Sequence, residues 1–261
     1  MPALAHVPVQ LLTQYDGGNR DARRQRTGGE SRCCNCPVES PYAAGTRTIP
    51  TVTKLKAAIF DIGGVLTHSP VTRIKAFCAE NGIPDDVRWA IFAPEDGPWS
   101  RFERSELTPE TFAAEFDVHI KPCGTSATGA GFMQWFFSGF GERPEMVNVV
   151  RHLRGKTKLA AITNNVARDE PAQRRTSGID VHSLFEVVIE SAIVGVRKPE
   201  PRIYQIACEK LGIEPHEAVF LDDLGANLKG ARALGMQTIK VDDTLSAIDE
   251  LERALGIPLP R

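Results

Sequence analysis

Residues 55–64 read Leu-Lys-Ala-Ala-Ile-Phe-Asp-Ile-Gly-Gly. A short apolar run that ends at an acidic residue and a glycine pair predicts a buried parallel strand leading into a loop. Segments of the same form follow at 157–163, 185–189, 218–222 and 237–241. We therefore expect five strands, each buried on both faces.

Helical patterns separate the later strands. Apolar residues recur at helical spacing in 201–211, 226–234 and 244–255. Strands that alternate with helices predict an α/β fold built on a doubly wound, mostly parallel sheet.

A long helical segment interrupts this alternation after the first strand. Helices are expected at 72–81, 84–92, 109–116, 127–138 and 144–153. The predicted organisation is an α/β core of residues 54–69 and 150–261, with an inserted helical cap of residues 70–149. In open α/β sheets the ligand binds at the carboxyl ends of the strands, which is where we expect the cap to lie.

Residues 1–53 have a different composition. They are rich in glycine, proline, arginine, serine and threonine, and no helical or strand period lasts through 17–48. This composition predicts a disordered extension. A cluster of cysteines at 33, 34 and 36 has no second ligand pair nearby, which favours exposed thiols over a zinc site.

Bulk composition excludes some classes of function. A formal net charge of −2 gives no electrostatic case for binding nucleic acid. No apolar run approaches the roughly 18 residues that a membrane span needs. Six scattered or clustered cysteines do not form a disulfide framework, so a reduced, cytoplasmic protein is expected.

Polar residues stand at the ends of three predicted strands and in one loop. Asp61 follows the first strand, Thr163 and Asn164 end the second, and Lys198 precedes the helix that begins at 201. A hydroxyl and an amide suit the oxygens of a phosphoryl group, and an ammonium neutralises its charge. Taken singly, Asp61 is explained by a tight turn and Thr163 or Asn164 by a helix cap. A loop lysine such as Lys198 usually faces solvent.

A fourth strand, 218–222, ends in two adjacent acids. Asp222 and Asp223 repel each other unless a cation or a donor joins them, although acids here can also cap the next helix. With Asp61 they form an all-oxygen site that suits Mg²⁺. All four sites lie at one predicted edge of the sheet, so we expect a joint magnesium and phosphoryl site.

The order Asp, Thr-Asn, Lys, Asp-Asp resembles the four signature motifs of the haloacid dehalogenase-like superfamily, across residues 55 to 258. Residues 196–204 and 220–229 are similar to the phosphatase domain of soluble epoxide hydrolases. Residues 61–66 and 97–102 are similar to the phosphatase-like domain fused to certain acyl-CoA dehydrogenases.

This resemblance implies a Mg²⁺-dependent hydrolase, a phosphomonoester phosphatase that forms an aspartyl-phosphate on Asp61. Thr163 and Asn164 would hold phosphoryl oxygens, and Lys198 would balance the charge on Asp61 and the phosphate. The metal ligands that the resemblance implies are Asp61, the Gly63 carbonyl, Asp223 and, in support, Asp222.

Gly63 departs from the family pattern, in which a second aspartate serves as general acid and base. A general acid–base contributes roughly 10²- to 10⁴-fold to the rate, so its loss predicts slow turnover that favours good leaving groups. His68, seven residues after Asp61, is the candidate replacement in the sequence.

Aromatic residues gather in the predicted cap. They build either the core of the cap or an apolar pocket for a small, lipid-like phosphorylated substrate. The residues are Trp89, Phe92, Trp99, Phe102, Trp135, Phe136 and Phe137.

Three alternatives keep the same fold. The first is a binding module that holds a phosphorylated ligand without turnover, which Gly63 favours. The second is a phosphotransferase. The third is a haloacid dehalogenase, which the Asp222-Asp223 pair disfavours because added negative charge would repel a carboxylate substrate.

Overall fold

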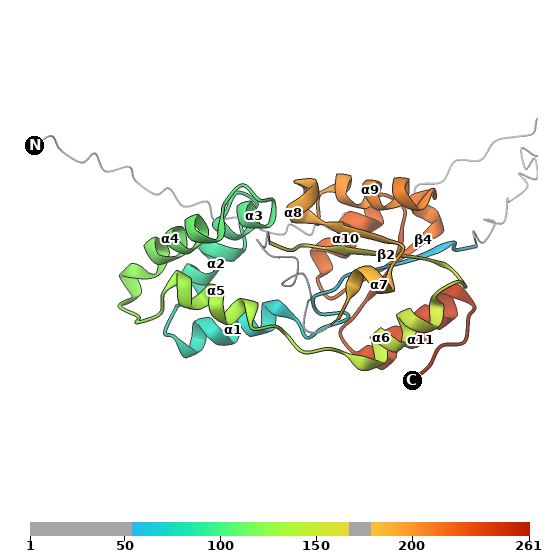
Figure 1. Cartoon of the computed structure of the whole chain (residues 1–261), viewed down its shortest axis with the longest axis horizontal. Helices are drawn as coiled ribbons and strands as arrows, with labels where there is room; N and C mark the ends of the chain where they lie inside the picture. Colours follow the sequence, from blue (N-terminus) through green and yellow to red (C-terminus); the bar gives the residue numbers. More distant parts are fainter. Residues whose placement is uncertain (1–53, 167–178) are drawn as a thin grey trace, which may run out of the picture. The chain divides into compact units, whose positions relative to one another are not determined.

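The computed structural model describes residues 54–166 and 179–261. Its sheet has five parallel strands in the order β3-β2-β1-β4-β5 (Figure 1). This confirms the predicted doubly wound parallel sheet. The strands are β1 (Ala57–Phe60), β2 (Lys158–Thr163), β3 (Val187–Glu190), β4 (Ala218–Asp222) and β5 (Gln237–Lys240).

Strand β1 lies at the centre of the sheet. It pairs with β2 on one side, where Ala57 is in register with Lys158, and with β4 on the other, where Ala57 is in register with Ala218. The chain runs outward through β2 and β3, then crosses back to β4 and β5. The strand order therefore reverses at the carboxyl end of β1, the position where doubly wound sheets bind ligands.

Helices cover both faces of the sheet. Alternate residues of β1 point to opposite faces: Ile59 packs with α9 and α10, and Phe60 packs with α6 and α11. Figure 1 shows these two helical layers. The core helices are α6 (Pro144–Leu153), α7 (Val181–Leu184), α8 (Ser191–Val194), α9 (Pro201–Leu211), α10 (Gly225–Ala233) and α11 (Thr244–Leu255), with a 3₁₀ turn at Pro215–Glu217.

The helical insertion follows β1 and has an apolar core of its own. Phe116 and Phe132 stack with ring centroids 4.9 Å apart, and Phe102 and Phe112 stack at the same distance. Most of its aromatic residues are thus explained by packing within the insertion. Its helices are α1 (Pro70–Glu80), α2 (Asp85–Phe92), α3 (Pro98–Glu103), α4 (Pro109–Ile120) and α5 (Gly129–Phe137), with a 3₁₀ turn at Lys121–Cys123.

The two ends of the insertion are joined side by side. An antiparallel bridge pairs Thr67 with Glu142, and the Arg143 N–H donates to the Leu66 carbonyl at 2.8 Å. Helix α6, which follows, packs on the sheet with α11. We propose a division into core and cap in which the chain returns to the core near Glu142, several residues before the predicted boundary.

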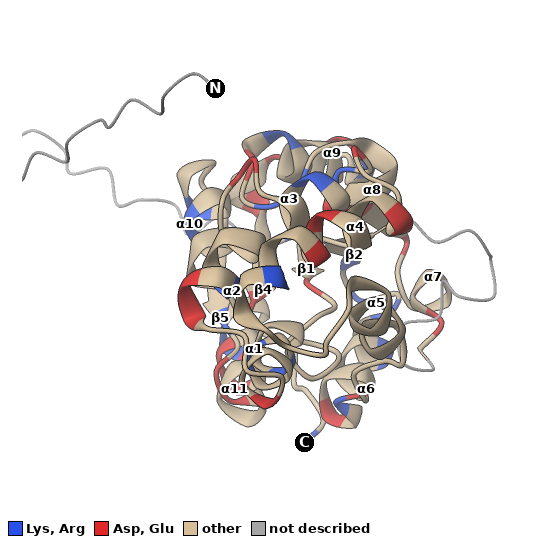
Figure 2. Ribbon diagram, turned by 90° about the vertical axis from the view of Figure 1, so that its left-hand side faces the viewer, with Lys and Arg blue, Asp and Glu red and all other residues tan. Residues whose placement is uncertain are grey.

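Basic and acidic residues are both scattered over the described helices (Figure 2), in keeping with a net charge of −2. Among the described residues, no helix has the length and apolar character to cross a membrane. The predicted extension at residues 1–53 and its cysteine cluster lie outside the described residues.

Candidate active site

Three carboxylates meet at the carboxyl ends of β1 and β4. Ligand atoms of Asp61, Asp222 and Asp223 all lie within 4.8 Å of one another. The buried Lys198 joins two of them, because its Nζ is 2.8 Å from Asp61 Oδ1 and 2.8 Å from Asp222 Oδ2. Four of the predicted site residues are therefore brought together, three at the ends of the neighbouring strands β1 and β4 and one from the loop before α9.

Asp222 acts as the support of this cluster. Its side chain has no exposed surface, and both oxygens accept hydrogen bonds. Oδ1 accepts from the Leu224 N–H at 2.8 Å, and the Asn227 amide donates to both oxygens at 3.0 Å. Lys198 also donates to Oδ2, so each carboxylate oxygen of Asp222 accepts two hydrogen bonds. This arrangement fits the supporting role expected of Asp222.

Asp223 lies against the turn that follows β1. Ser69 Oγ donates to Asp223 Oδ2 at 2.7 Å. Gly64 has a φ of +81°, and a Cβ there would lie 2.2 Å from Asp223 Oδ2. Glycine is therefore required at residue 64 both for its left-handed backbone and for the space that Asp223 occupies.

Burial and mutual repulsion raise the pKa of two of these acids. Desolvation raises the pKa of Asp61 well above its usual range, against the opposing effect of Lys198. Desolvation likewise raises the pKa of Asp223, which the Ser69 hydrogen bond opposes. When all three carboxyl groups are ionised, they leave two negative charges beyond the Lys198 ammonium, which one divalent cation balances. The all-oxygen donor set and this charge fit Mg²⁺.

Thr163 and Asn164 occupy different positions at the end of β2. Thr163 is half-buried and lines the cavity. The Asn164 side chain instead clamps the backbone of Lys198: the Lys198 N–H donates to Asn164 Oδ1 at 2.8 Å, and Asn164 Nδ2 donates to the Lys198 carbonyl at 3.0 Å. The side-chain amide of Asn164 thus positions Lys198. The phosphate contact predicted for Asn164 would therefore come from the backbone N–H of Asn164.

The cavity above these residues has a volume of about 260 Å³ and two chemically distinct sides. We call the polar side the floor; it comprises Asp61, Gly63, Thr163, Asn164, Lys198 and Asp223. We call the apolar side the wall; it comprises Ile74, Trp89, Phe92, Trp99, Phe136 and Phe140 of the helical insertion and its return segment.

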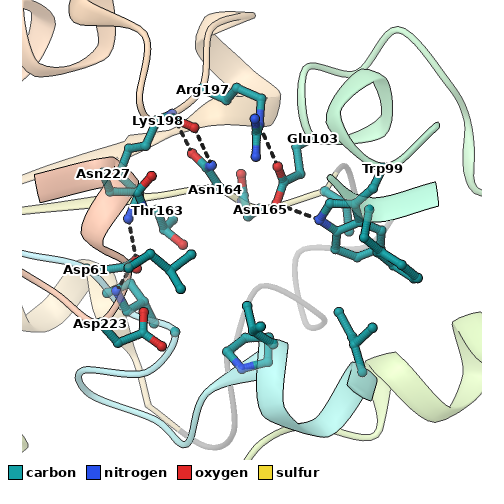
Figure 3. Close-up of a pocket in the computed structure, with 18 of the residues that line it drawn as sticks. Asp61, Trp99, Glu103, Thr163, Asn164, Asn165, Arg197, Lys198, Asp223 and Asn227 are labelled. Carbon is teal, nitrogen blue, oxygen red and sulfur yellow. Dashed lines mark hydrogen bonds and ion pairs between the residues drawn. The ribbon is translucent and has the colours of Figure 1, made fainter. Parts of the chain in front are cut away.

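An ion pair connects the insertion to the core at the edge of the floor. Arg197 Nε donates to Glu103 Oε2 at 2.7 Å, and Trp99 Nε1 donates to Glu103 Oε1 at 2.8 Å (Figure 3). Burial raises the pKa of Glu103, an effect that Arg197 opposes. The sequence analysis assigned no role to Glu103 or Arg197. The available signal was an acid four residues after a tryptophan, a spacing that puts both side chains on one face of a helix.

His68 lies outside the cavity. Its side chain is exposed and is not among the residues that line the floor or the wall. Nothing in this geometry supports His68 as the replacement for the missing acid. At residue 63 a Cβ would meet Pro70 Cδ and Cγ at 3.0 Å, so Pro70 of α1 crowds the position.

Residues 55–235 match the family model of the haloacid dehalogenase-like hydrolases. The chain belongs to this family. A haloacid dehalogenase-like family enzyme from Bacteroides thetaiotaomicron, solved with magnesium and inorganic phosphate, has 25% sequence identity to it. The match has a TM-score of 0.52 and covers 71% of this chain and 93% of the other.

This haloacid dehalogenase-like chain is also similar to parts of longer proteins. It is 37% identical over 218 residues to acyl-CoA dehydrogenase family member 10 of Mus musculus, a match that covers 78% of this chain and 19% of that protein. It is 32% identical over 221 residues to bifunctional epoxide hydrolase 2 of Rattus norvegicus, a match that covers 79% of this chain and 40% of that protein. Both resemblances expected from the motifs are confirmed.

A third relative has a similar length. The chain is 29% identical over 207 residues to sesquiterpene phosphatase astK of Aspergillus oryzae, which covers 78% of this chain and 98% of that protein. By contrast, the chain spans 19% to 40% of the length of the two larger relatives. The predicted enzyme class, a hydrolase of this family, is confirmed by the family match.

Proposed function

We propose that this chain is a Mg²⁺-dependent phosphomonoester phosphatase that acts through an aspartyl-phosphate on Asp61. The observation that carries the proposal is the contact of one buried ammonium, Lys198, with both Asp61 and Asp222 inside a three-carboxylate cluster. An acid held in this way is a positioned nucleophile, and the floor around it suits a dianion once a cation is bound.

The chemistry requires two displacements at phosphorus. A carboxylate oxygen of Asp61 attacks, the bond from phosphorus to the ester oxygen breaks, and the leaving alkoxide takes its proton from water because Gly63 supplies none. Water then attacks the aspartyl-phosphate and releases inorganic phosphate and free Asp61. Thr163 and the Asn164 backbone N–H donate to phosphoryl oxygens, while Lys198 orients Asp61 and favours its ionised form.

Asp61, Asp223 and the Gly63 carbonyl would hold Mg²⁺, with Asp222 in support, and the bound ion would neutralise negative charge on the phosphoryl oxygens. The fit rests on the two excess negative charges and the oxygen-only donor set described above. Most of the rate acceleration then comes from positioning and electrostatics.

The wall supports a substrate with an apolar body. Trp99, Phe92 and Phe136 face the same cavity as Asp61, so a phosphate on the floor would place its ester group against aromatic side chains. The similarity to a sesquiterpene phosphatase is in keeping with this substrate class. We infer a small, lipid-like phosphate ester as substrate.

Phosphate release from a panel of phosphomonoesters, with and without Mg²⁺, tests the proposal. We expect Mg²⁺-dependent release that Asp61→Asn reduces on the order of 10⁴-fold or more. Rapid quench with an activated aryl phosphate should give a burst and an acid-stable label on the wild-type protein. Binding of phosphate esters without Asp61-dependent phosphate release or labelling would instead identify a binding module. Transfer of the phosphoryl group to an added alcohol would identify a phosphotransferase.

Gly63 gives a second test of the same mechanism. In Gly63→Asp/Pro70→Ala the new carboxyl has the space that Pro70 otherwise occupies. With a poor leaving group such as an alkyl phosphate we expect kcat to rise, by up to about 10²- to 10⁴-fold. Gly63→Ala/Pro70→Ala is the matched control, because it adds the Cβ without the acid. An equal change in both variants would show that residue 63 does not limit turnover through proton transfer.

A further inference from the structure

Arg197 lies where the floor meets the wall, and only one of its three guanidinium nitrogens is engaged. Its Nε donates to Glu103 Oε2, and among the described residues Nη1 and Nη2 make no hydrogen bond or ion pair. The side chain lines the cavity and is 16% exposed. Figure 3 shows it reaching down from the Lys198 loop towards Glu103.

The geometry of the Glu103 contact differs from that of a simple tether. Arginine and carboxylate commonly pair through two parallel hydrogen bonds, which uses two nitrogens of the guanidinium. Here the Trp99 indole takes Glu103 Oε1, so Arg197 contacts only Oε2 and its outer edge stays open. Glu103 is 6% exposed and accepts one hydrogen bond on each carboxylate oxygen, which fixes the direction of its carboxylate.

The orientation of Arg197 is fixed from both sides. Trp99 packs against Phe136 with ring centroids 4.9 Å apart, which holds the indole and through it Glu103. On the core side Asn164 clamps the backbone of Lys198, the next residue in the chain. A guanidinium that is already oriented loses little side-chain entropy when it binds an anion.

Arg197 is also close to the phosphoryl site in electrostatic terms. Arg197 directly precedes Lys198 in the chain, and both side chains line the cavity together with Asp61. Lys198 itself is committed to the two aspartates. The open edge of Arg197 is therefore a second cationic position beside the floor.

We propose that Arg197 forms a second anion subsite, so that the substrate carries an additional anionic group between its transferred phosphoryl group and its apolar body. The group is a carboxylate or a further phosphate, both of which accept two parallel hydrogen bonds from the guanidinium. This inference rests on the proposed phosphatase function for the identity of the first site. Glu103 and Trp99 are positioning residues that aim the guanidinium.

Binding to Asp61→Asn in the presence of Mg²⁺ tests the subsite without turnover. Calorimetry would compare three ligands of equal chain length: an alkyl monophosphate, a phosphate ester of a hydroxy fatty acid with the carboxylate near the phosphate, and an alkyl diphosphate. One or both of the doubly anionic ligands should bind about ten-fold or more tightly than the alkyl monophosphate, as a charge-assisted pair allows. The ligand that binds more tightly identifies the additional anionic group as a carboxylate or a phosphate.

Substitutions then assign the preference to Arg197. Arg197→Gln should abolish it and leave the affinity for the alkyl monophosphate within about three-fold, and Arg197→Lys should retain part of it. Arg104→Gln is the matched control, because Arg104 pairs with Glu106 and Glu200 and does not line the cavity. It should leave the preference unchanged.

Glu103→Gln distinguishes two roles of Arg197: binding an anion of the substrate, and only joining the insertion to the core. This variant weakens the link between insertion and core but keeps the Arg197 charge, so part of the preference should remain. Equal loss for all three ligands in Arg197→Gln and Glu103→Gln, or no preference in the parent, would overturn the subsite. Should the preference hold while no phosphomonoester is turned over by the wild-type protein, the subsite stands and the phosphatase function fails.

Discussion

On the floor of the cavity Lys198 is held by charge-assisted hydrogen bonds, and so is the buried Asp222 that it contacts, each with two or more partners. On the wall, Phe136 is held by contact with other rings, including Trp99 at 4.9 Å and Phe140 at 5.0 Å. Hydrogen bonds fix direction, whereas ring packing fixes volume and tolerates change of shape. The comparison separates a rigid chemical site from an adaptable surface for the rest of the substrate.

The largest expected effect is on the floor. Lys198→Met leaves Asp61 and Asp222 facing each other without a cation, so we expect a destabilisation of about 3–5 kcal/mol and the loss of turnover. Chemical denaturation and phosphate release would measure both. Lys229→Met, which removes an exposed lysine of α10, should stay within about 0.5 kcal/mol of wild type. Similar effects of the two substitutions would contradict a charge-dependent floor.

The wall should respond through packing instead. Phe136→Ala opens a cavity among the rings, with an expected cost of about 3 kcal/mol. Because the floor is untouched, kcat for a small aryl phosphate should change little in the folded protein, while KM for a long-chain phosphate rises. Urea titration measures the loss of stability, and steady-state kinetics measure kcat and KM. Val118→Ala, at an exposed site of α4, is the neutral control. A large fall in kcat for the aryl phosphate would show that the two sides are coupled.

Metal binding should make the floor dependent on pH. The folded state raises the pKa of Asp61, so without metal this group contributes stability that is present below its ordinary pKa and lost as pH rises through the raised value. Mg²⁺ binds the ionised carboxylate, and its stabilisation should therefore grow over the same window. At 100 times Kd it would reach about 2.7 kcal/mol. Thermal unfolding from acid to neutral pH measures this shift, and a pH-independent effect of Mg²⁺ would contradict it.

The smallest expected effect comes from Ser69. Ser69→Ala removes the donor to Asp223 Oδ2, which raises the pKa of Asp223 further and loosens its carboxylate. We expect Mg²⁺ affinity to fall about ten-fold, in line with other groups that orient metal ligands. Calorimetric titration with Mg²⁺ measures it, and Ser246→Ala, at an exposed position of α11, serves as the control. Unchanged affinity would mean that Asp223 is positioned by the turn alone.

Much of the fold was predictable because its signals are local. The bounds of α6 and α11 agree with the sequence prediction, since Pro144 and Asp243 mark where these helices begin and the apolar period lasts to their ends. The first strand begins two residues later than expected, at Ala57. Helix α3 was not predicted, because six residues are too few to establish a helical period.

The candidate site divides in the same way. Asp61, Asp222 and Asp223 could be grouped from the sequence, because the carboxyl ends of neighbouring parallel strands meet at one edge of the sheet. The Glu103–Arg197 pair could not, since its partners are 94 residues apart and join the insertion to the core. The pattern of a helix carries no information about which distant loop it contacts.

The bridge between Thr67 and Glu142 has a consequence for how such enzymes diversify. Because the insertion leaves and re-enters the core at adjacent backbone positions, its removal or replacement closes no long gap and costs little loop entropy. A segment of different length or sequence can be spliced between these two residues while β1 and its neighbours keep their register. Recombination at this point would exchange the apolar wall as a unit and leave Asp61, Lys198 and Asp223 in place.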